Sequence, residues 1–407
     1  MIRLIDMILF ETVKALKEKT PFGYLALTMM AVAFSFTGWT ILSTNFAINA
    51  AKMDGLEWGW AHSIREIPGF LAFTTVYLLL VLSEQRLAAF SVFLLGVGIA
   101  LTGYFPTGSG FFITTFVMSV GFHYYYTVFL SLPMQMFEAD DYPIIRSKLR
   151  SIDSAVAAIS FLLVLAFVYW LEVNFKILFL LFGLAAIIIS LYCLFAYKPF
   201  KLKHAQQMKI ILRKRYCLYY LLQFLSGARR QIFVVFAALL LVEKFDYSVL
   251  EIAGLFFANH LITTIAAPYI GRFVLGFGER FVLQIEYLGL IIVFTLYAFV
   301  DVSWLAALLY IIDNIFFSLA IALESYFKRI ADKTEIAASA GVVFTINHIA
   351  AVFLPALLGA VWLFDHSLVF YLGAGLACLS FLATCLIPRY PNQGNETQSF
   401  SLALKVK

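Results

Sequence analysis

Two adjacent arginines lie inside an apolar run of the sequence. The run extends from Cys217 to Val242, which is long enough to cross a bilayer, and Arg229 and Arg230 lie near its middle. An arginine at the centre of a bilayer costs roughly 2.5–3.5 kcal/mol on the insertion scale. A guanidinium presents a planar fork of donors that matches a carboxylate or a phosphate. Both arginines are therefore candidates for binding an anionic group.

Helical geometry gives the two arginines different directions. Gln223, Ser226 and Arg230 recur at spacings of three and four residues, so they form one polar stripe along a helix. Arg229 points about 100° away from that stripe. We therefore expect Arg230, together with Gln223, to be the better candidate for the ligand contact. Arg229 is expected to face a neighbouring helix.

Acidic side chains in other apolar segments could neutralise one arginine or carry a proton. Asp313 lies in the middle of a later apolar segment and Glu324 lies nearer its end. We expect one arginine to form an internal salt bridge with Asp313 or Glu324, although Glu324 could instead pair with Lys328 four residues on. A buried carboxyl group can also exchange protons. Asp313 and Glu324 are thus the first proton-coupling candidates, followed by His260 and His348.

The chain has the composition of an integral membrane protein. Its 407 residues are 63% hydrophobic and 13% charged, with a mean hydropathy of +0.92, whereas soluble domains carry about 25% charged residues. The four cysteines lie in or beside apolar runs without metal-ligand spacing, so neither a metal nor another cofactor is expected. Twelve apolar windows could span a membrane, at residues 23–48, 67–83, 87–104, 111–133, 153–171, 176–196, 217–242, 250–270, 281–300, 304–326, 338–361 and 367–388.

The basic residues indicate the orientation of these spans. With the N-terminus in the cytoplasm, 23 of the 29 lysines and arginines fall on the cytoplasmic side and four on the outer side, the last two being Arg229 and Arg230. This bias predicts that both termini are cytoplasmic in a plasma membrane, here a bacterial inner membrane. The net charge of +5 then reflects topology and contact with anionic lipid rather than nucleic acid. Arg65 and Glu66, before the second span, could form an outer gate pair or a solvated interface.

The segments outside the spans divide the chain. Residues 1–20 have an apolar face along a helix, which is typical of an amphipathic helix lying in the membrane interface. Residues 197–216 form a basic linker between two parts of nearly equal length, at 21–196 and 217–388. Residues 389–407 form a polar cytoplasmic tail, which we expect to lack fixed structure.

This organisation resembles the major facilitator superfamily of transporters, in particular bacterial-type members. The resemblance covers nearly the whole chain: two halves of six spans, cytoplasmic ends and a basic linker. The signature loop of that family has a glycine, a later aspartate, then a glycine and basic residues. Gly271–Arg272 followed by Gly278–Arg280 is similar to its second copy, with Leu275 in place of the aspartate, and the first copy is reduced to Glu84 and Arg86.

The resemblance implies an all-α fold with twelve transmembrane helices in two six-helix bundles. It also implies that the first, fourth, seventh and tenth helices line a central cavity with the substrate site near the midplane. Polar residues of this sequence fall on those four helices. They are Asn45 on the first, His123 and Tyr126 on the fourth, Gln223 and Arg230 on the seventh, and Asp313 and Asn314 on the tenth.

The function expected from these features is secondary active transport of a small organic anion by alternating access, coupled to protons. No phosphate-binding loop and no arrangement of catalytic residues is found in the sequence, so we do not expect an enzyme. The partners expected are the anionic substrate, protons and membrane lipid, with the protein a monomer. Two alternatives remain: a drug or lipid exporter of the same fold, favoured by the 43 phenylalanines and 21 tyrosines, and a membrane scaffold that transports nothing.

Overall fold

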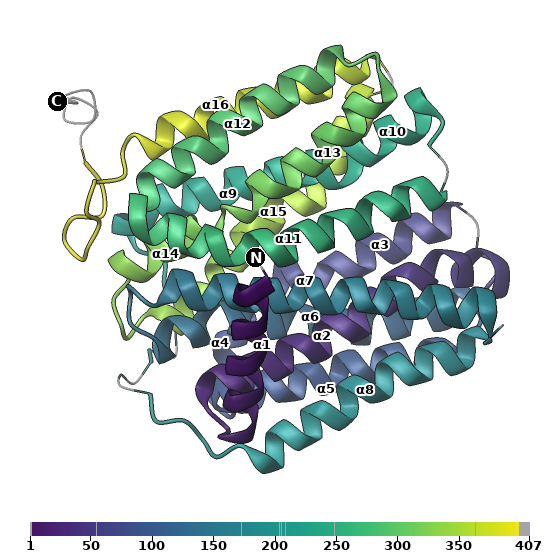
Figure 1. Ribbon diagram of the computed structural model, residues 1–407, viewed down its shortest axis with the longest axis horizontal. Coiled ribbons are helices and arrows are strands. Elements are labelled where there is room, and N and C mark those ends of the chain that lie inside the picture. Colours follow the sequence, from purple (N-terminus) through teal and green to yellow (C-terminus); the bar gives the residue numbers. More distant parts are fainter. Residues whose placement is uncertain are drawn as a thin grey trace. The chain divides into compact units, whose positions relative to one another are not determined.

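The regular structure of the protein is helical. The computed structural model describes residues 2–53, 55–171, 173–202, 204, 206–207, 209–247, 249–362 and 364–398. Within these residues the strand-type pairing is one isolated bridge between Asn392 and Asn395. The first half of the chain contains α1 (Ile2–Lys17), α2 (Pro21–Asn45), α3 (Gly55–Phe70), α4 (Thr75–Leu78), α5 (Glu84–Thr102), α6 (Gly108–Met136), α7 (Tyr142–Leu165) and α8 (Phe175–Ala196) (Figure 1).

The second half continues the same pattern of long helices. It contains α9 (Cys217–Gln231), α10 (Ala238–Phe245), α11 (Val249–Phe277), α12 (Glu279–Phe299), α13 (Ser303–Ser318), α14 (Ile321–Ile330), α15 (Ile336–Trp362) and α16 (His366–Thr384). Side-chain caps explain several of the starts. Thr20 accepts a hydrogen bond from the Gly23 N–H before α2, and Asn174 accepts one from the Ile177 N–H before α8. Each cap satisfies an N–H group that the first helical turn leaves without a partner.

Ten helical stretches among the described residues have the length and apolar character to cross a membrane. They coincide with ten of the twelve expected spans. The expected span 67–83 instead falls on the end of α3, the 3-10 turn η2 (Leu71–Thr74) and α4, where the helix is interrupted. The expected span 111–133 falls on α6, which is long enough to cross the bilayer but carries His123 and three tyrosines.

Three of the spanning stretches change from α-helix to a short π-helix. These segments are η1 (Phe46–Ala50) after α2, η3 (Ala166–Trp170) after α7, and η5 (Ile232–Ala237) between α9 and α10. The first begins directly after Asn45 and the third begins two residues after Arg230. π-helical turns inside α-helices are frequent at functional sites. Both candidate residues therefore lie where the helix geometry is locally altered.

The chain forms two compact units. Unit 1 comprises residues 1–136, 148–210 and 337–344, and unit 2 comprises residues 137–147, 211–336 and 345–407. In unit 1, α5 packs most extensively against α6 and α8. Gly121 permits this approach, because a Cβ atom there would lie 2.3 Å from the Leu95 nitrogen. In unit 2, the most extensive contact joins α12 and α16.

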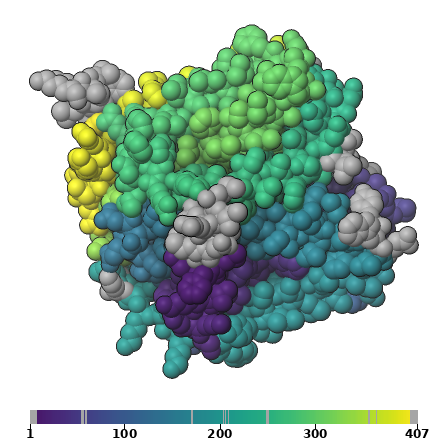
Figure 2. Space-filling model, in the orientation of Figure 1, coloured from purple at the N-terminus to yellow at the C-terminus, as the bar shows by residue number. Residues whose placement is uncertain are grey.

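The amphipathic helix α1 belongs to unit 1 and lies on the outside of the structure, in purple in Figure 2. Ile8 and Ala15 are buried, whereas Leu9 and Phe10 are exposed. Lys148 on α7 pairs with Glu11 at 2.5 Å. One face of the helix is thus held by the unit, and the exposed apolar side chains are available to lipid. The interfacial position of this helix remains a prediction.

The prediction that the C-terminal tail lacks fixed structure is wrong for the tail residues that the structure describes. Residues 389–398 fold back onto unit 2, since the Gln398 N–H donates to the Leu386 carbonyl (2.9 Å) and Tyr326 Oη donates to the Glu396 carbonyl (2.6 Å). Residues 399–407 lie outside the described part. A polar composition did not prevent order here because backbone groups of the tail found partners in the bundle.

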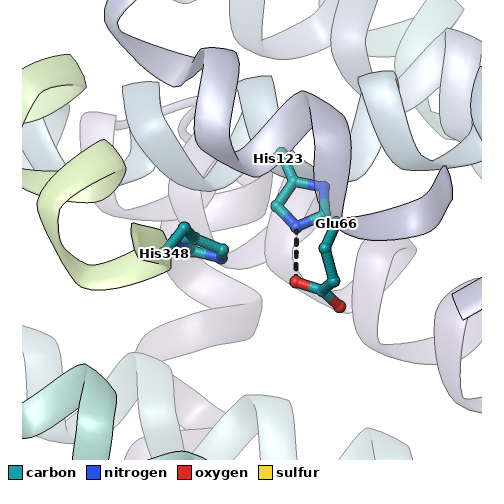
Figure 3. Close-up of side chains that lie close together, drawn as sticks. All are labelled: Glu66, His123 and His348. Atoms are coloured by element: carbon teal, nitrogen blue, oxygen red, sulfur yellow. Dashed lines mark ion pairs between the residues drawn. The ribbon is translucent and has the colours of Figure 1, made fainter. Parts of the chain in front are cut away.

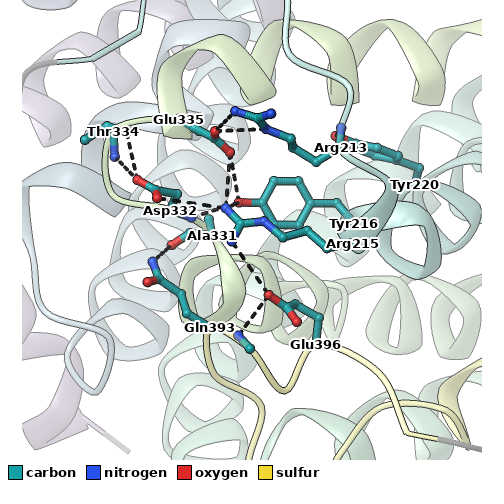
Figure 4. A network of polar contacts seen from close by, with 11 residues as sticks. Arg213, Arg215, Tyr216, Tyr220, Ala331, Asp332, Thr334, Glu335, Gln393 and Glu396 are labelled. Carbon is teal, nitrogen blue, oxygen red and sulfur yellow. Dashed lines mark hydrogen bonds and ion pairs between the residues drawn. The ribbon is translucent and has the colours of Figure 1, made fainter.

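The folded tail meets two other segments in a polar cluster. Glu335, directly before α15, accepts hydrogen bonds from Arg213 and from Tyr216 Oη (3.2 Å) (Figure 4). Burial alone would raise the pKa of Glu335, but hydrogen bonds and charge from Arg213 hold it below its usual value. The pKa of Asp332 is also lowered, by the N–H and hydroxyl groups of Thr334. Both carboxylates are therefore ionised at neutral pH.

We predict an acid-dependent stability from this cluster. A carboxyl group whose folded pKa lies below its unfolded value stabilises the fold above the unfolded pKa, about 4.3 for glutamate, and loses that effect as the pH falls through the folded pKa. Glu335→Gln should therefore lower the melting temperature by about 2–4 °C at pH 7, with a difference from wild type that shrinks toward pH 3.5. Thermal unfolding of purified protein measures this. Glu18→Gln, at an exposed pair with Lys14, is the control and should change little. A pH-independent effect of Glu335→Gln would contradict the prediction.

Candidate functional site

Arg229 of α9 is buried beside an acidic residue of α12. Its Nη1 lies 3.6 Å from Glu286 Oε1, and the two side chains are 4% and 2% exposed. The guanidinium carbon also lies 4.3 Å from the centre of the Tyr287 ring. Such a contact attracts a cation to the face of the ring. Arg229 is thus held inside unit 2 by a carboxylate and an aromatic ring.

The ion pair of Arg229 is formed with Glu286, although Asp313 also lies within electrostatic range of the guanidinium. We expected Asp313 or Glu324, and the residue found is Glu286. The sequence contained a signal for it, because Glu286 lies within the apolar run of α12 and an ionisable residue inside a membrane segment indicates function by default. Glu286 is not part of a polar stripe along its helix, so helical periodicity did not predict it.

Asp313 completes a buried group of three charges. It is 2% exposed on α13 and lies within electrostatic range of Arg229 and of Glu286. Among the described residues, Arg229 Nε and Glu286 Oε2 are buried without a hydrogen-bond partner. Two carboxyl groups and one guanidinium are electrically neutral when one carboxyl carries a proton. An extra negative charge would be costly in such a dry environment.

Arg230 has a different environment from Arg229, as the helical stripe predicted. It is half-buried, whereas Arg229 is fully buried. Further along α9, Gln223 Nε2 donates to Tyr219 Oη (2.9 Å) and the Gln223 carbonyl accepts from Asn347 Nδ2 (3.2 Å). Asn347, on α15, was not among the sequence candidates. The polar stripe of α9 is therefore extended by a side chain of another helix of unit 2.

The helices α9 and α15 touch at Gly227. A Cβ atom on Gly227 would lie 2.2 Å from the Asn347 carbonyl oxygen, which belongs to the backbone and cannot rotate away. Close approach of this kind depends on small residues at helix contacts. Gly227 therefore positions the stripe that carries Gln223 and Arg230.

Gly227→Ala is expected to destabilise the protein by about 1–3 kcal/mol, the usual cost of overpacking. Alanine normally favours a helix over glycine by about 1 kcal/mol, so the sign of the change is diagnostic. Gly254→Ala on α11 is the matched control, because its Cβ atom would meet nothing within 4 Å. Thermal unfolding of both variants should show a loss for Gly227→Ala alone. An unchanged or raised melting temperature for Gly227→Ala would contradict the close contact.

The remaining candidates of unit 2 lie on α11, α13 and α15. Asn314 Nδ2 donates to Thr263 Oγ1 on α11 (2.9 Å). The His260 carbonyl accepts from Thr264 Oγ1 (2.7 Å). His348 is buried on α15, one residue after Asn347. Asn314 thus links α13 to α11, and a direct role in substrate or proton binding remains a prediction for these three residues.

Glu324 lies in a different arrangement from Glu286. It accepts hydrogen bonds from Arg146 Nη2 (2.7 Å) and from Tyr142 Oη (2.9 Å), and a second guanidinium nitrogen of Arg146 completes the pair. The partner is therefore Arg146 of α7 rather than Lys328. A fork-to-fork pair of this type is among the strong, geometrically fixed interactions between side chains. This geometry favours a structural role for Glu324 over proton transfer.

The candidates of unit 1 are arranged around His123 on α6. His123 is 3% exposed, and its Nε2 lies 3.9 Å from Glu66 Oε2 on α3 (Figure 3). Ser119 Oγ lies 2.9 Å from His123 Nδ1, and Arg65 pairs with Glu66 at 2.8 Å. Glu66 is thus turned toward the interior of the unit, which distinguishes it from a solvated interface.

Two further candidates of unit 1 are separate from His123. Tyr126 is half-buried and packs against Phe122, with the ring centres 4.6 Å apart. Asn45 is exposed at the end of α2. The place of both residues in a substrate site remains a prediction.

Comparison with known proteins identifies the family to which the chain belongs. The family model of the Major Facilitator Superfamily matches residues 28–355, and the chain belongs to that family. It is therefore an integral membrane transporter rather than an enzyme. A search among curated proteins gave no match.

Solved structures share the fold at low sequence identity. The human organic anion transporter MFSD10 (TETRAN) has a TM-score of 0.71 and 14% identity, covering 89% of this chain and 98% of its own. The transporter FucP in its outward conformation has a TM-score of 0.73 and 13% identity, covering 93% and 99%. A bacterial homologue of the iron transporter ferroportin has a TM-score of 0.72 and 14% identity, covering 90% and 98%. Because proteins with this fold transport different substrates, the fold alone does not identify the substrate of this chain.

Proposed function

We propose that this transporter moves a small organic anion across the membrane by alternating access and that it couples the movement to protons. The observation that carries the proposal is the difference between the two arginines of α9. Arg229 is neutralised inside unit 2 by Glu286, whereas Arg230 is half-buried on the polar stripe with Gln223. A partly accessible guanidinium within a membrane span is suited to a carboxylate or phosphate group.

Proton coupling is supported by the charge count around Arg229. Glu286 and Asp313 share one buried guanidinium, so the group is neutral with one proton bound and negative without it. A transporter can use such a change to link proton release to a change of conformation. One similar solved structure is FucP of E. coli, a fucose:proton symporter, and another is the human organic anion transporter MFSD10. The fold accommodates both properties in other proteins.

The membrane setting of this proposal is a bacterial inner membrane with both termini in the cytoplasm. The support is the unequal distribution of basic residues between the two sides. A reporter enzyme fused after residue 398, active only in the cytoplasm, should be active in cells. Activity of a periplasm-specific reporter at that position instead would reverse the orientation.

Uptake into proteoliposomes tests the transport function. Purified protein is reconstituted, a pH gradient is imposed, and a panel of small mono- and dicarboxylates and phosphate esters is offered alongside neutral sugars and organic cations. We expect accumulation of at least one anion, which collapses when a protonophore removes the gradient. Accumulation of cations or neutral compounds alone would overturn the anion assignment, and accumulation that ignores the protonophore would overturn proton coupling.

A further inference from the structure

One buried amide group of α11 has an oxygen atom without a hydrogen bond. The residue is Asn259, which is 6% exposed, and its Oδ1 accepts no hydrogen bond from the part of the chain that the structure describes. A buried acceptor without a donor is unfavourable, because the bond that water would supply has been lost. The oxygen of Asn259 is therefore suited to a donor that a ligand brings.

The position of Asn259 on α11 places it on the side that faces α13. Asn259 shares a helical face with Phe256 and Thr263, at spacings of three and four residues. That face packs on α13, which lies beside α11 (Figure 1). The rings of Phe256 and Tyr310 have centres 5.9 Å apart, and Thr263 Oγ1 accepts the hydrogen bond from Asn314 Nδ2 (2.9 Å). Asn259 lies between these two contacts.

A second ring contact gives the level of the two arginines relative to the same helices. Phe233, in η5, lies against Tyr310 of α13 with ring centres 4.8 Å apart. One turn before Phe233 are Arg229 and Arg230, and one turn after Tyr310 is Asp313. Arg229 lies within electrostatic range of Asp313, so α9 and α13 run in opposite directions here. The arginines are therefore at the level of the polar faces of α11 and α13, all within unit 2.

The polar groups at this level recognise different parts of a ligand. Arg230 offers N–H donors, which suit a carboxylate or a phosphate. Asn259 offers an acceptor, and Asn314 gives an amide hydrogen to Thr263 and keeps its own amide oxygen as an acceptor. A hydroxyl group can donate to such an oxygen without bringing a second positive charge close to the arginines, whereas an ammonium group would bring one.

We propose that Asn259 is a specificity-determining residue and that the transported anion is a hydroxy acid. Its charged group binds Arg230, and a hydroxyl group donates to Asn259 Oδ1. The inference rests on the proposed anion transport and narrows the class of substrate. An acid that lacks the hydroxyl group leaves the amide oxygen buried and unsatisfied, and a site built in this way discriminates strongly against such an analogue.

Binding of matched acids to the purified full-length protein tests the inference. Lactate and propionate, malate and succinate, and gluconate and hexanoate are pairs that differ only in hydroxyl groups. Alanine carries an ammonium group where lactate has its hydroxyl group. Dissociation constants are obtained from thermal stabilisation by each acid. The proteins compared are wild type, Asn259→Leu, Asn259→Ala and Arg230→Gln.

Thr295→Val is the matched control. Thr295 lies on α12, where its hydroxyl group donates to the Ile291 carbonyl of the same helix (2.7 Å). The substitution removes one polar group from a membrane-spanning helix of unit 2 without touching α9, α11 or α13. It should leave the dissociation constant of every acid as in wild type.

We expect wild type to bind the hydroxylated member of at least one pair about tenfold or more tightly than its partner, since one buried acceptor left unsatisfied shifts binding by that order. Either replacement of Asn259 should abolish this preference and keep the affinity for the plain acid. Arg230→Gln should weaken both members of the pair and keep the preference. The two residues would then be shown to bind different groups of one ligand.

Equal affinity for the two members of every pair in wild type would overturn the inference and leave anion transport standing. The same holds if the preference survives in Asn259→Leu or Asn259→Ala, or if alanine binds more tightly than lactate. Binding of none of the acids would contradict the proposed anion transport itself, and the inference would fall with it. Wild type alone decides the first and last of these outcomes, so the test does not depend on the folding of a variant.

Discussion

Glu286→Gln is expected to abolish proton-driven accumulation while leaving the protein folded and able to exchange substrate. The variant leaves Arg229 with Asp313, a pair that is neutral without any proton. No carboxyl group of the cluster then needs to bind or release a proton during the cycle. Counterflow, which needs no gradient, should continue at a rate close to wild type, and uphill uptake in an imposed pH gradient should be lost.

Replacing Arg229 should instead reduce the stability of the folded protein. Arg229→Met leaves two buried carboxyl groups without their guanidinium, and breaking a buried pair from one side typically costs about 3–5 kcal/mol. We expect little folded protein from this variant, and partial recovery when Glu286→Gln is added. Thermal unfolding of the single and double variants measures the coupling. Continued uphill uptake by Glu286→Gln, or a double variant no more stable than Arg229→Met, would contradict the assignment of this cluster.

Arg230→Gln is expected to remove recognition of the anion, with about a 100-fold loss of apparent affinity, while the melting temperature changes little. Arg230 is only partly buried, so its replacement should cost less stability than the loss of the buried Arg229. Arg230→Lys should be intermediate, because an ammonium group keeps the charge but lacks the planar fork.

Lys244→Gln is the matched control for Arg230. Lys244 lies at the end of α10, on the same membrane-spanning stretch, and pairs with the exposed Asp301 at 2.8 Å. Its removal should leave anion affinity within about twofold of wild type. Equal losses for Lys244→Gln and Arg230→Gln would indicate a general effect of positive charge. Equal effects of Arg229 and Arg230 replacements on both folding and affinity would remove the distinction between the two arginines.

Most of the fold could be predicted from the sequence, because a chain that crosses a membrane must have apolar helices of a fixed minimum length. Apolar windows of about 20 residues and the alternation of basic loops are determined by the bilayer itself. The predictions of membrane spans were less accurate where a helix is interrupted or carries polar side chains, because hydropathy alone does not describe such segments. The expected span 67–83 is interrupted at η2, and α6 carries His123 among apolar residues.

The candidate site was predicted less completely, for a physical reason. Helical periodicity separates Arg229 from Arg230 because it depends on one helix alone. The partners of these side chains depend on which helices are neighbours, and periodicity within one helix carries no such information. Glu286 and Asn347 therefore entered only with the structure, and Glu324 was found with Arg146 rather than Lys328. The folded tail was missed for a similar reason, since its partners lie on α14 and in the loop before α15.

Uptake of one anion by proteoliposomes under an imposed pH gradient is the most direct test of the central claim. It compares wild type with Arg230→Gln and Lys244→Gln, each shown beforehand to have an unchanged melting temperature. The account predicts concentrative uptake by wild type and Lys244→Gln, and uptake at the level of empty liposomes for Arg230→Gln. Uptake by Arg230→Gln at the wild-type rate and affinity would contradict the claim that this arginine binds the transported anion.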